Sequence, residues 1–139
     1  MANNNQIHFV NVTGRYTLSG DLELAANIQN LHILSDALNS DRESQSLKLS
    51  VPELVPPSPY DGFLDSMLIL HTDSFVNIQR NQSAISIIGE KKYLAVMADN
   101  IKFLATNACG SNSHIHIEYF PESSYLHSLS LSLIISVEL

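Results

Sequence analysis

Two histidines and a glutamate alternate with isoleucines in residues 113–121, where the order is Ser-His-Ile-His-Ile-Glu-Tyr-Phe-Pro. Successive side chains of a β-strand point to opposite faces, so His114, His116 and Glu118 would share one face. Neutral imidazoles and a carboxylate are ligands that zinc and other transition metals accept. These three residues, here called the histidine row, are therefore the first candidate for chemistry. A docking surface and an ordinary water-facing strand are the alternatives.

Little else in the sequence supports catalysis. Three further histidines could supply a ligand, although no spacing places them beside the row: His8, His71 and His127. There is no glycine-rich phosphate loop, no Cys-x-x-Cys pair and no Gly-x-Ser-x-Gly motif. Cys109 precedes His114 closely, but a partly buried structural cysteine is the simpler interpretation. We expect a protein that is not an enzyme and uses no cofactor. The alternative is a metal-binding protein or small hydrolase built on the histidine row.

The chain is acidic, with 14 Asp and Glu against 7 Lys and Arg and a net charge of -7. A nucleic-acid partner is not expected, because its phosphates would require a basic stripe. The excess is concentrated in residues 1–65, which hold eight acidic and three basic residues. Such an excess favours a basic protein partner, because complementary potentials accelerate encounter. Solubility alone is the other explanation.

The length of 139 residues and the hydrophobic fraction of 45% indicate a single domain, residues 1–139, with its own core. One cysteine cannot form an internal disulfide, which favours a reducing compartment. The sequence begins without a charged-then-apolar leader, and no apolar run approaches the roughly 18 residues that cross a bilayer. We therefore expect a cytoplasmic protein that does not engage a membrane.

The first half alternates between periodic segments and loops. We expect disorder in 1–6, a hairpin of strands 7–12 and 15–18, a helix over 22–38 and a strand over 47–51. Residues 52–62, here called the proline loop, contain four of the five prolines of the chain. Proline fixes φ and lacks an N–H, so this segment is neither a helix nor a central strand. Long loops in small domains are often functional or mobile.

The second half has clearer signals. We expect strands at 67–71, 75–79 and 84–88 as an antiparallel meander, a helix over 90–106, and strands at 113–120 and 129–137. Ile115, Ile117 and Tyr119 would then face the core. The fold class is α+β, with a single antiparallel sheet made of the meander and a C-terminal hairpin, and two helices packed on one face.

This second half resembles the immunity proteins of bacterial polymorphic toxin systems, and among them the immunity protein 32 family. The specific part is the His-x-His-x-Glu-Tyr-Phe-Pro stretch, 114–121, followed by Tyr125-Leu126 and a closing apolar strand. The segments 67–79 and 84–89 and the helix 90–106 complete the resemblance. Residues 1–62 carry no part of it.

The resemblance implies a small cytoplasmic protein that binds and neutralises one cognate toxin, through the C-terminal domain of that toxin. We expect that domain to be basic, and the chain to be a monomer or a weak dimer when alone. Another interpretation is a homo-oligomer paired through an exposed edge strand such as 129–137. Expected partner-binding residues are the acids near the proline loop and turns, the histidine row and one tyrosine: Asp61, Asp65, Asp73, His114, His116, Glu118 and Tyr125.

Overall fold

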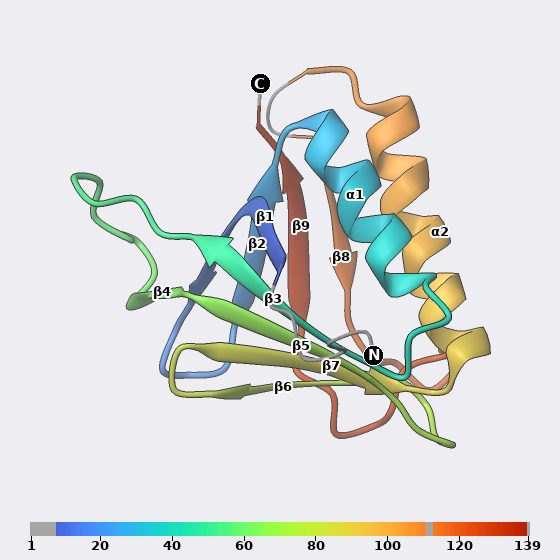
Figure 1. Cartoon of the computed structure of the whole chain (residues 1–139). Helices are drawn as coiled ribbons and strands as arrows, with labels where there is room; N and C mark the ends of the chain where they lie inside the picture. Colours follow the sequence, from blue (N-terminus) through green and yellow to red (C-terminus); the bar gives the residue numbers. More distant parts are fainter. Residues whose placement is uncertain (1–7, 111–112, 139) are drawn as a thin grey trace, which may run out of the picture.

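The computed structural model describes residues 8–110 and 113–138, and the predicted disorder of residues 1–6 lies outside them. The described residues form an α+β domain, as predicted (Figure 1). Its elements are β1 (His8–Tyr16), β2 (Leu22–Ala26), α1 (Ile28–Leu38), β3 (Ser44–Ser50), β4 (Gly62–Leu64), β5 (Ser66–His71), β6 (Asn77–Asn81), β7 (Ala84–Gly89), α2 (Lys91–Asn107), β8 (His114–Ile117) and β9 (Leu133–Val137).

The strands form one curled sheet in the order β6-β7-β5-β3-β1-β2-β9-β8, with β4 paired to β1 beside this path. Three pairs are parallel, namely β1 with β3, β2 with β9, and β5 with β7. The prediction of a single antiparallel sheet is therefore wrong, because the sheet is mixed. The two helices lie side by side on one of its faces, as predicted (Figure 1).

The core lies between the helices and this face of the sheet. Fully buried side chains come from both layers: Leu31, Leu34 and Leu38 of α1, Leu94, Met97 and Ile101 of α2, and Val12, Leu24 and Ile135 of the sheet. Ser35 is a buried polar residue between the helices, and its hydroxyl donates to the carbonyl of Ala98 at 2.8 Å. The helical spacing of the apolar residues thus predicted the buried face of α2, and that of α1 from Leu31 onward.

The predicted turn at Thr13-Gly14 is wrong, because β1 continues through both residues. A Cβ on Gly14 would lie 2.9 Å from the Cβ of Leu64 and 3.1 Å from Cδ2 of Leu24. This glycine therefore serves a close approach of neighbouring strands within the sheet. The chain reverses further along, where Gly20 has a φ of 110° that favours glycine.

The predicted helix over 22–38 begins too early. Residues 22–26 form β2, which pairs with β9, and the helix begins at Ile28. The side chain of Asn27 caps it by accepting a hydrogen bond from the N–H of Asn30 at 2.9 Å. Leu22, Leu24 and Ala26 also alternate with period two, and pairing with a distant strand decides between the two readings.

The predicted antiparallel meander of 67–88 is also wrong, although its strands lie close to the expected residues. β7 lies between β5 and β6 and pairs parallel with β5. The chain leaving β5 passes the end of β7, where a Cβ on Gly89 would lie 2.8 Å from Cα of Val76. The N–H of Thr72 donates to the carbonyl of Gly89 at 3.0 Å in the same crossing. Glycine at this position makes the crossing possible.

The two C-terminal strands are shorter than predicted, since β8 ends at Ile117 and β9 begins at Leu133. Tyr119, expected in the core, is 40% exposed. Residues 125–131 instead run along β6, where the N–H of Leu131 donates to the carbonyl of Ile78 at 2.8 Å. β9 lies between β2 and β8, so the prediction of an edge strand at 129–137 is wrong.

The segment between β3 and β4, which includes the proline loop except Gly62, has no helix or strand and projects from the body of the domain (Figure 1). This agrees with the prediction from its prolines. Within 8–110 and 113–138, no helix has the length and apolar character that a membrane crossing requires.

Candidate docking groove

The sheet face opposite the helices, here called the outer face, carries aligned rows of side chains. Ile117 of β8 and Ile135 of β9 point to the core, so the residues that alternate with them take the outer face. The strand registers align two rows across β1, β2, β9 and β8: Thr13, Ala25, Ser136 and His114 in the first, and Arg15, Glu23, Ile134 and His116 in the second.

The first row consists of small side chains up to its end at His114, and a groove of about 580 Å³ lies over it. We call it the outer groove. Besides the row itself, it is lined by Arg15 and Glu23 of the second row. The remaining lining comes from the proline loop, β4, the last residue of β9 and the residue after it: Pro52, Val55, Pro56, Phe63, Val137 and Glu138. The groove therefore lies between the sheet and the base of the projecting loop.

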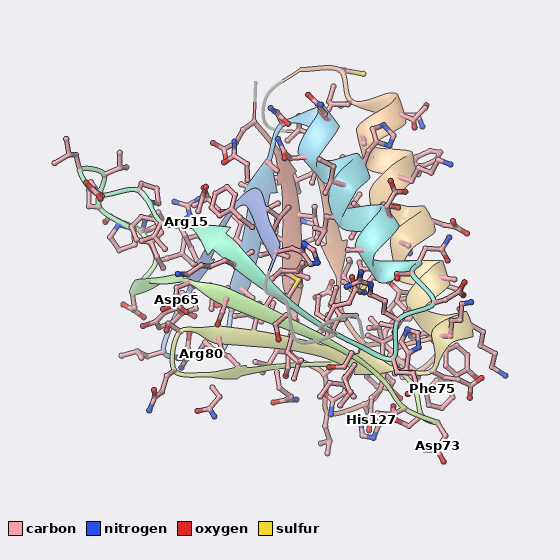
Figure 2. The ribbon with its side chains drawn as sticks, viewed as in Figure 1. Arg15, Asp65, Asp73, Phe75, Arg80 and His127 are labelled. Atoms are coloured by element: carbon pink, nitrogen blue, oxygen red, sulfur yellow. The ribbon has the colours of Figure 1, made fainter. Side chains whose placement is uncertain are left out.

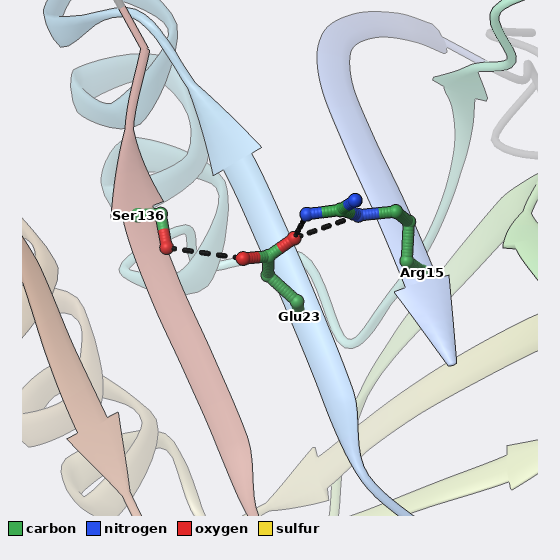
Figure 3. A network of polar contacts seen from close by, with 3 residues as sticks. All are labelled: Arg15, Glu23 and Ser136. Atoms are coloured by element: carbon green, nitrogen blue, oxygen red, sulfur yellow. Dashed lines mark hydrogen bonds and ion pairs between the residues drawn. The ribbon is translucent and has the colours of Figure 1, made fainter. Parts of the chain in front are cut away.

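An ion pair occupies one side of the outer groove (Figure 3). Nε of Arg15 donates to Oε1 of Glu23 at 2.8 Å, Nη2 of Arg15 donates to the same oxygen, and the hydroxyl of Ser136 donates to Oε2 at 3.3 Å. The two charged side chains are 26% and 12% exposed. The Arg15 guanidinium also lies over the ring of Tyr60, 4.7 Å from its centroid, which attaches the proline loop to the sheet.

The same surroundings act on Tyr60. Partial burial raises the pKa of its phenol, and the negative charge of Glu23 raises it further. Because Arg15 is neutralised by Glu23, the exposed carboxylate of Glu138 leaves the groove with an acidic excess. An acidic groove with apolar walls suits a basic side chain whose aliphatic stem packs on Val55 and Phe63.

The tip of the proline loop presents apolar side chains to solvent. Leu54 is 96% exposed and Val55 is 61% exposed, and Val51, directly before the loop, is 46% exposed. Prolines follow this tip directly, and Asp61 fixes the end of the loop because its carboxylate accepts from the N–H of Leu18 at 2.7 Å. The loop thus holds large apolar side chains outside the core and beside the groove.

The structure gathers some of the predicted partner-binding residues and separates others. His114 lines the outer groove together with part of the proline loop, a combination that the sequence led us to expect. Asp65 and Asp73 are exposed at opposite ends of β5 (Figure 2). Tyr125 is half-buried against the core, where its hydroxyl accepts from Nδ2 of Asn100 at 3.2 Å and burial raises its pKa. These last three residues do not line the groove.

The histidine row is incomplete. The rings of His114 and His116 lie edge to face, with centroids 5.0 Å apart, on the outer face. Glu118 lies beyond the end of β8 and does not continue the strand. In the part of the chain that the structure describes, no three His, Cys, Asp or Glu side chains are grouped so that they could hold a metal. Cys109, expected to be partly buried, is exposed. Among the described residues, the three members of the histidine row are therefore not grouped as metal ligands.

Sequence reasoning missed Arg15, Glu23 and Ser136. Opposite charges eight residues apart, on either side of a glycine turn, were a usable signal for a cross-strand pair between Arg15 and Glu23. That signal was hidden by the assignment of residue 23 to a helix. Nothing near Ser136 in the sequence points to a residue 113 positions away.

The fold and groove define a two-layer α+β domain whose open sheet face is bordered by a projecting loop. Folds of this type carry many unrelated functions, so function must be argued from the site. Compared with known proteins, the chain matches no family model, and no curated protein matches it significantly.

Proposed function

We propose that this chain is an immunity protein that binds one antibacterial toxin domain through the outer groove and the proline loop and occludes the active cleft of the toxin. The observation that carries the proposal is the 96% exposed Leu54 at the tip of a proline-flanked loop beside the groove. A large side chain held in water has no stabilising role within the monomer. A group of exposed apolar side chains beside an acidic groove is typical of protein interfaces.

The prolines favour binding for an entropic reason. Pro52, Pro56 and Pro57 restrict the backbone on both sides of Leu54 before any partner arrives. A loop that is already restricted loses less conformational entropy when it docks, so more of the contact energy appears as affinity. The loop therefore suits insertion into a cleft of a partner, while the groove at its base receives a side chain from that partner.

Charge supports a basic partner. The chain carries a net charge of -7, and Glu53 and Asp61 on the loop and Glu138 at the groove are exposed. A toxin cleft that handles nucleotides or RNA is lined by Lys and Arg, and such a cleft would be steered to this surface. Association should slow steeply with added salt. An association rate that does not change with salt would remove electrostatic steering from the proposal.

Residues 114–121 resemble immunity proteins, and this resemblance is the reason for proposing a toxin as the partner. On this proposal the chain works in the cytoplasm, needs no cofactor and performs no reaction of its own. The partner is the C-terminal domain of a toxin encoded beside this chain.

Co-expression tests the proposal directly. The toxin domain encoded immediately upstream is induced in cells that carry this chain, and growth is followed. We expect the chain to restore growth and the double variant Leu54→Ser with Val55→Ser to fail. Leu129→Ser is the matched control, because Leu129 is 71% exposed but lies beside β6, where its carbonyl accepts from Nε2 of Gln79 at 2.8 Å. Protection by the double variant equal to that by the control would refute the docking surface.

A further inference from the structure

The two edge strands of the sheet, β6 and β8, differ in how their outer edges are covered. The outer edge of β6 is covered by residues 125–131, where N–H groups of His127 and Leu131 donate to carbonyls of Val76 and Ile78 at 2.8 Å. β8 ends the sheet at the other side and pairs with β9. An exposed strand edge is a template for another strand, and proteins usually protect it. The outer edge of β8 is therefore the candidate for pairing with another strand.

Register shows which backbone groups of β8 face outward. The N–H of Val137 donates to the carbonyl of Ser113 at 2.8 Å, so these opposed residues form a hydrogen-bonded pair. Such pairs alternate along an antiparallel ladder, so Ile115 and Ile117 also bond to β9, and the backbone groups of His116 point away from it. The backbone hydrogen bonds that residues 8–110 and 113–138 form outside the strand ladders do not include His116.

An apolar shelf borders this edge on the helix side. A groove of about 360 Å³ lies between the C-terminal half of α2 and β8, with Phe103, Leu104 and Ala108 on one side and Ile115 on the other. Phe103 of α2 is 67% exposed, so a large apolar side chain of this shelf is in contact with solvent. A strand added to β8 would cover both the shelf and the outward backbone groups of His116.

We infer that a second copy of this chain adds that strand, pairing β8 antiparallel to β8 about a two-fold axis at His116. In this register His116 of the two copies exchange their backbone hydrogen bonds. Ile115 of each copy faces Ile117 of the other. On the outer face, Glu118 of each copy lies opposite His114 of the other, so the strand extends by one residue and each Glu118 carboxylate accepts a hydrogen bond from the facing imidazole.

The sequence of β8 is the argument for a second copy. The order His-Ile-His-Ile-Glu is self-complementary about its centre in size and in hydrogen-bonding groups, whereas a foreign strand requires no such pattern. Moving the axis to Ile115 would set His114 against His116 and leave Glu118 without an opposed histidine. The inference goes beyond the proposed function, because it needs no toxin and uses the edge of β8 instead of the proline loop.

Sedimentation of the full chain over a wide concentration series at physiological salt is the test. We expect the dimer fraction to rise with concentration. His116→Pro removes the outward N–H, and proline is tolerated on an edge strand whose N–H faces solvent, so the variant should stay folded and become monomeric. His116→Ala keeps the N–H and should still dimerise. A wild-type chain that is monomeric throughout, or a folded His116→Pro variant that dimerises normally, would overturn the inference.

Charge exchange tests the axis. Glu118→Lys should weaken the dimer, and adding His114→Glu should restore it, because each glutamate then faces a lysine. A double variant that remains as weak as Glu118→Lys would place the axis elsewhere. Hydrogen exchange identifies a different occupant: a His116 amide protected by the toxin domain, but never by raising the concentration of the chain alone, would assign the edge to a foreign strand and contradict self-pairing.

Discussion

Arg15 of β1 and Glu23 of β2 lie directly opposite each other in the sheet, and two nitrogens of the guanidinium donate to the same carboxylate oxygen. The other oxygen accepts from Ser136 of β9, so one carboxylate joins three strands (Figure 3). Both side chains are mostly shielded from water, and they form one side of the outer groove. The pair therefore links the stability of the sheet to the shape of the candidate site.

Replacing Glu23 with Gln should lower the free energy of unfolding by about 1–2 kcal/mol, because Arg15 keeps its charge and loses its counter-ion in a partly buried place. Urea denaturation measures this loss. The matched control is Asp41→Asn, which removes the pair between Lys91 and Asp41, whose side chains are 52% and 89% exposed. We expect the control to cost less than about 0.5 kcal/mol. Equal losses in the two variants would show that Arg15 and Glu23 behave as an ordinary surface pair.

Gly89→Ala should destabilise the domain by about 2–3 kcal/mol, because the new methyl group meets the backbone of Val76, which cannot move aside as a side chain could. Truncating Val76 to alanine in the same chain should not relieve the clash. Gly20→Ala is the comparison, since its cost of about 1 kcal/mol comes from a positive φ in an open turn. Thermal and urea unfolding of these variants measure the losses. An unchanged stability of Gly89→Ala would show that the chain after β5 does not pass as close to β7 as described.

Ile117 and Tyr119 should respond differently to truncation. Ile117 is 2% exposed and packs in the core, so Ile117→Ala should cost about 2–4 kcal/mol. Tyr119 lies beyond the end of β8 and is 40% exposed, so Tyr119→Ala should cost about 1 kcal/mol or less. Similar losses in the two variants would mean that the strand continues to residue 119, as the sequence alone suggested.

The pKa of Tyr125 predicts a dependence of stability on alkaline pH. Burial raises the pKa of the folded phenol above its value of about 10 in the unfolded chain, and the hydrogen bond from Asn100 offsets part of this rise. Between the two pKa values the folded state keeps a proton that the unfolded state has released. Stability from this group is therefore complete below about pH 10 and falls as pH rises toward the folded pKa.

Urea denaturation between about pH 9 and about pH 11 measures this fall, and Tyr125→Phe should make it shallower. The difference between the two proteins isolates Tyr125 from Tyr60, whose pKa is also raised. Identical slopes would show that the Tyr125 hydroxyl is as well solvated in the folded chain as in the unfolded one.

The periodicity of apolar residues predicted an element correctly where the pattern fits either a helix or a strand, but not both. The helix that became α2 has an apolar stripe that no strand could use, and it was placed within one residue at each end. Residues 22–26 fit both periods, and the distant strand β9 decided between them. Which strands pair is a matter of tertiary contact, so the insertion of β7 between β5 and β6 could not be read from residues 67–88.

The candidate site divides in the same way. The proline loop and His114 could be chosen from the sequence, because prolines and alternating histidines are local signals. The rest of the outer groove is made by four strands in register, and Ser136 reaches it only through the pairing of β9 with β2. Tyr119 was misplaced because the alternation of residues 113–120 continues past the point where β8 ends.

The affinity of the purified toxin domain for variants of the proline loop tests the central claim most directly. The account predicts that Leu54→Ser with Val55→Ser weakens binding by at least about 30-fold, or about 2 kcal/mol, while the melting temperature stays unchanged because both side chains are exposed. Leu129→Ser should bind as the wild type does. Wild-type affinity in the loop variant, measured by calorimetry on the folded protein, would contradict the account.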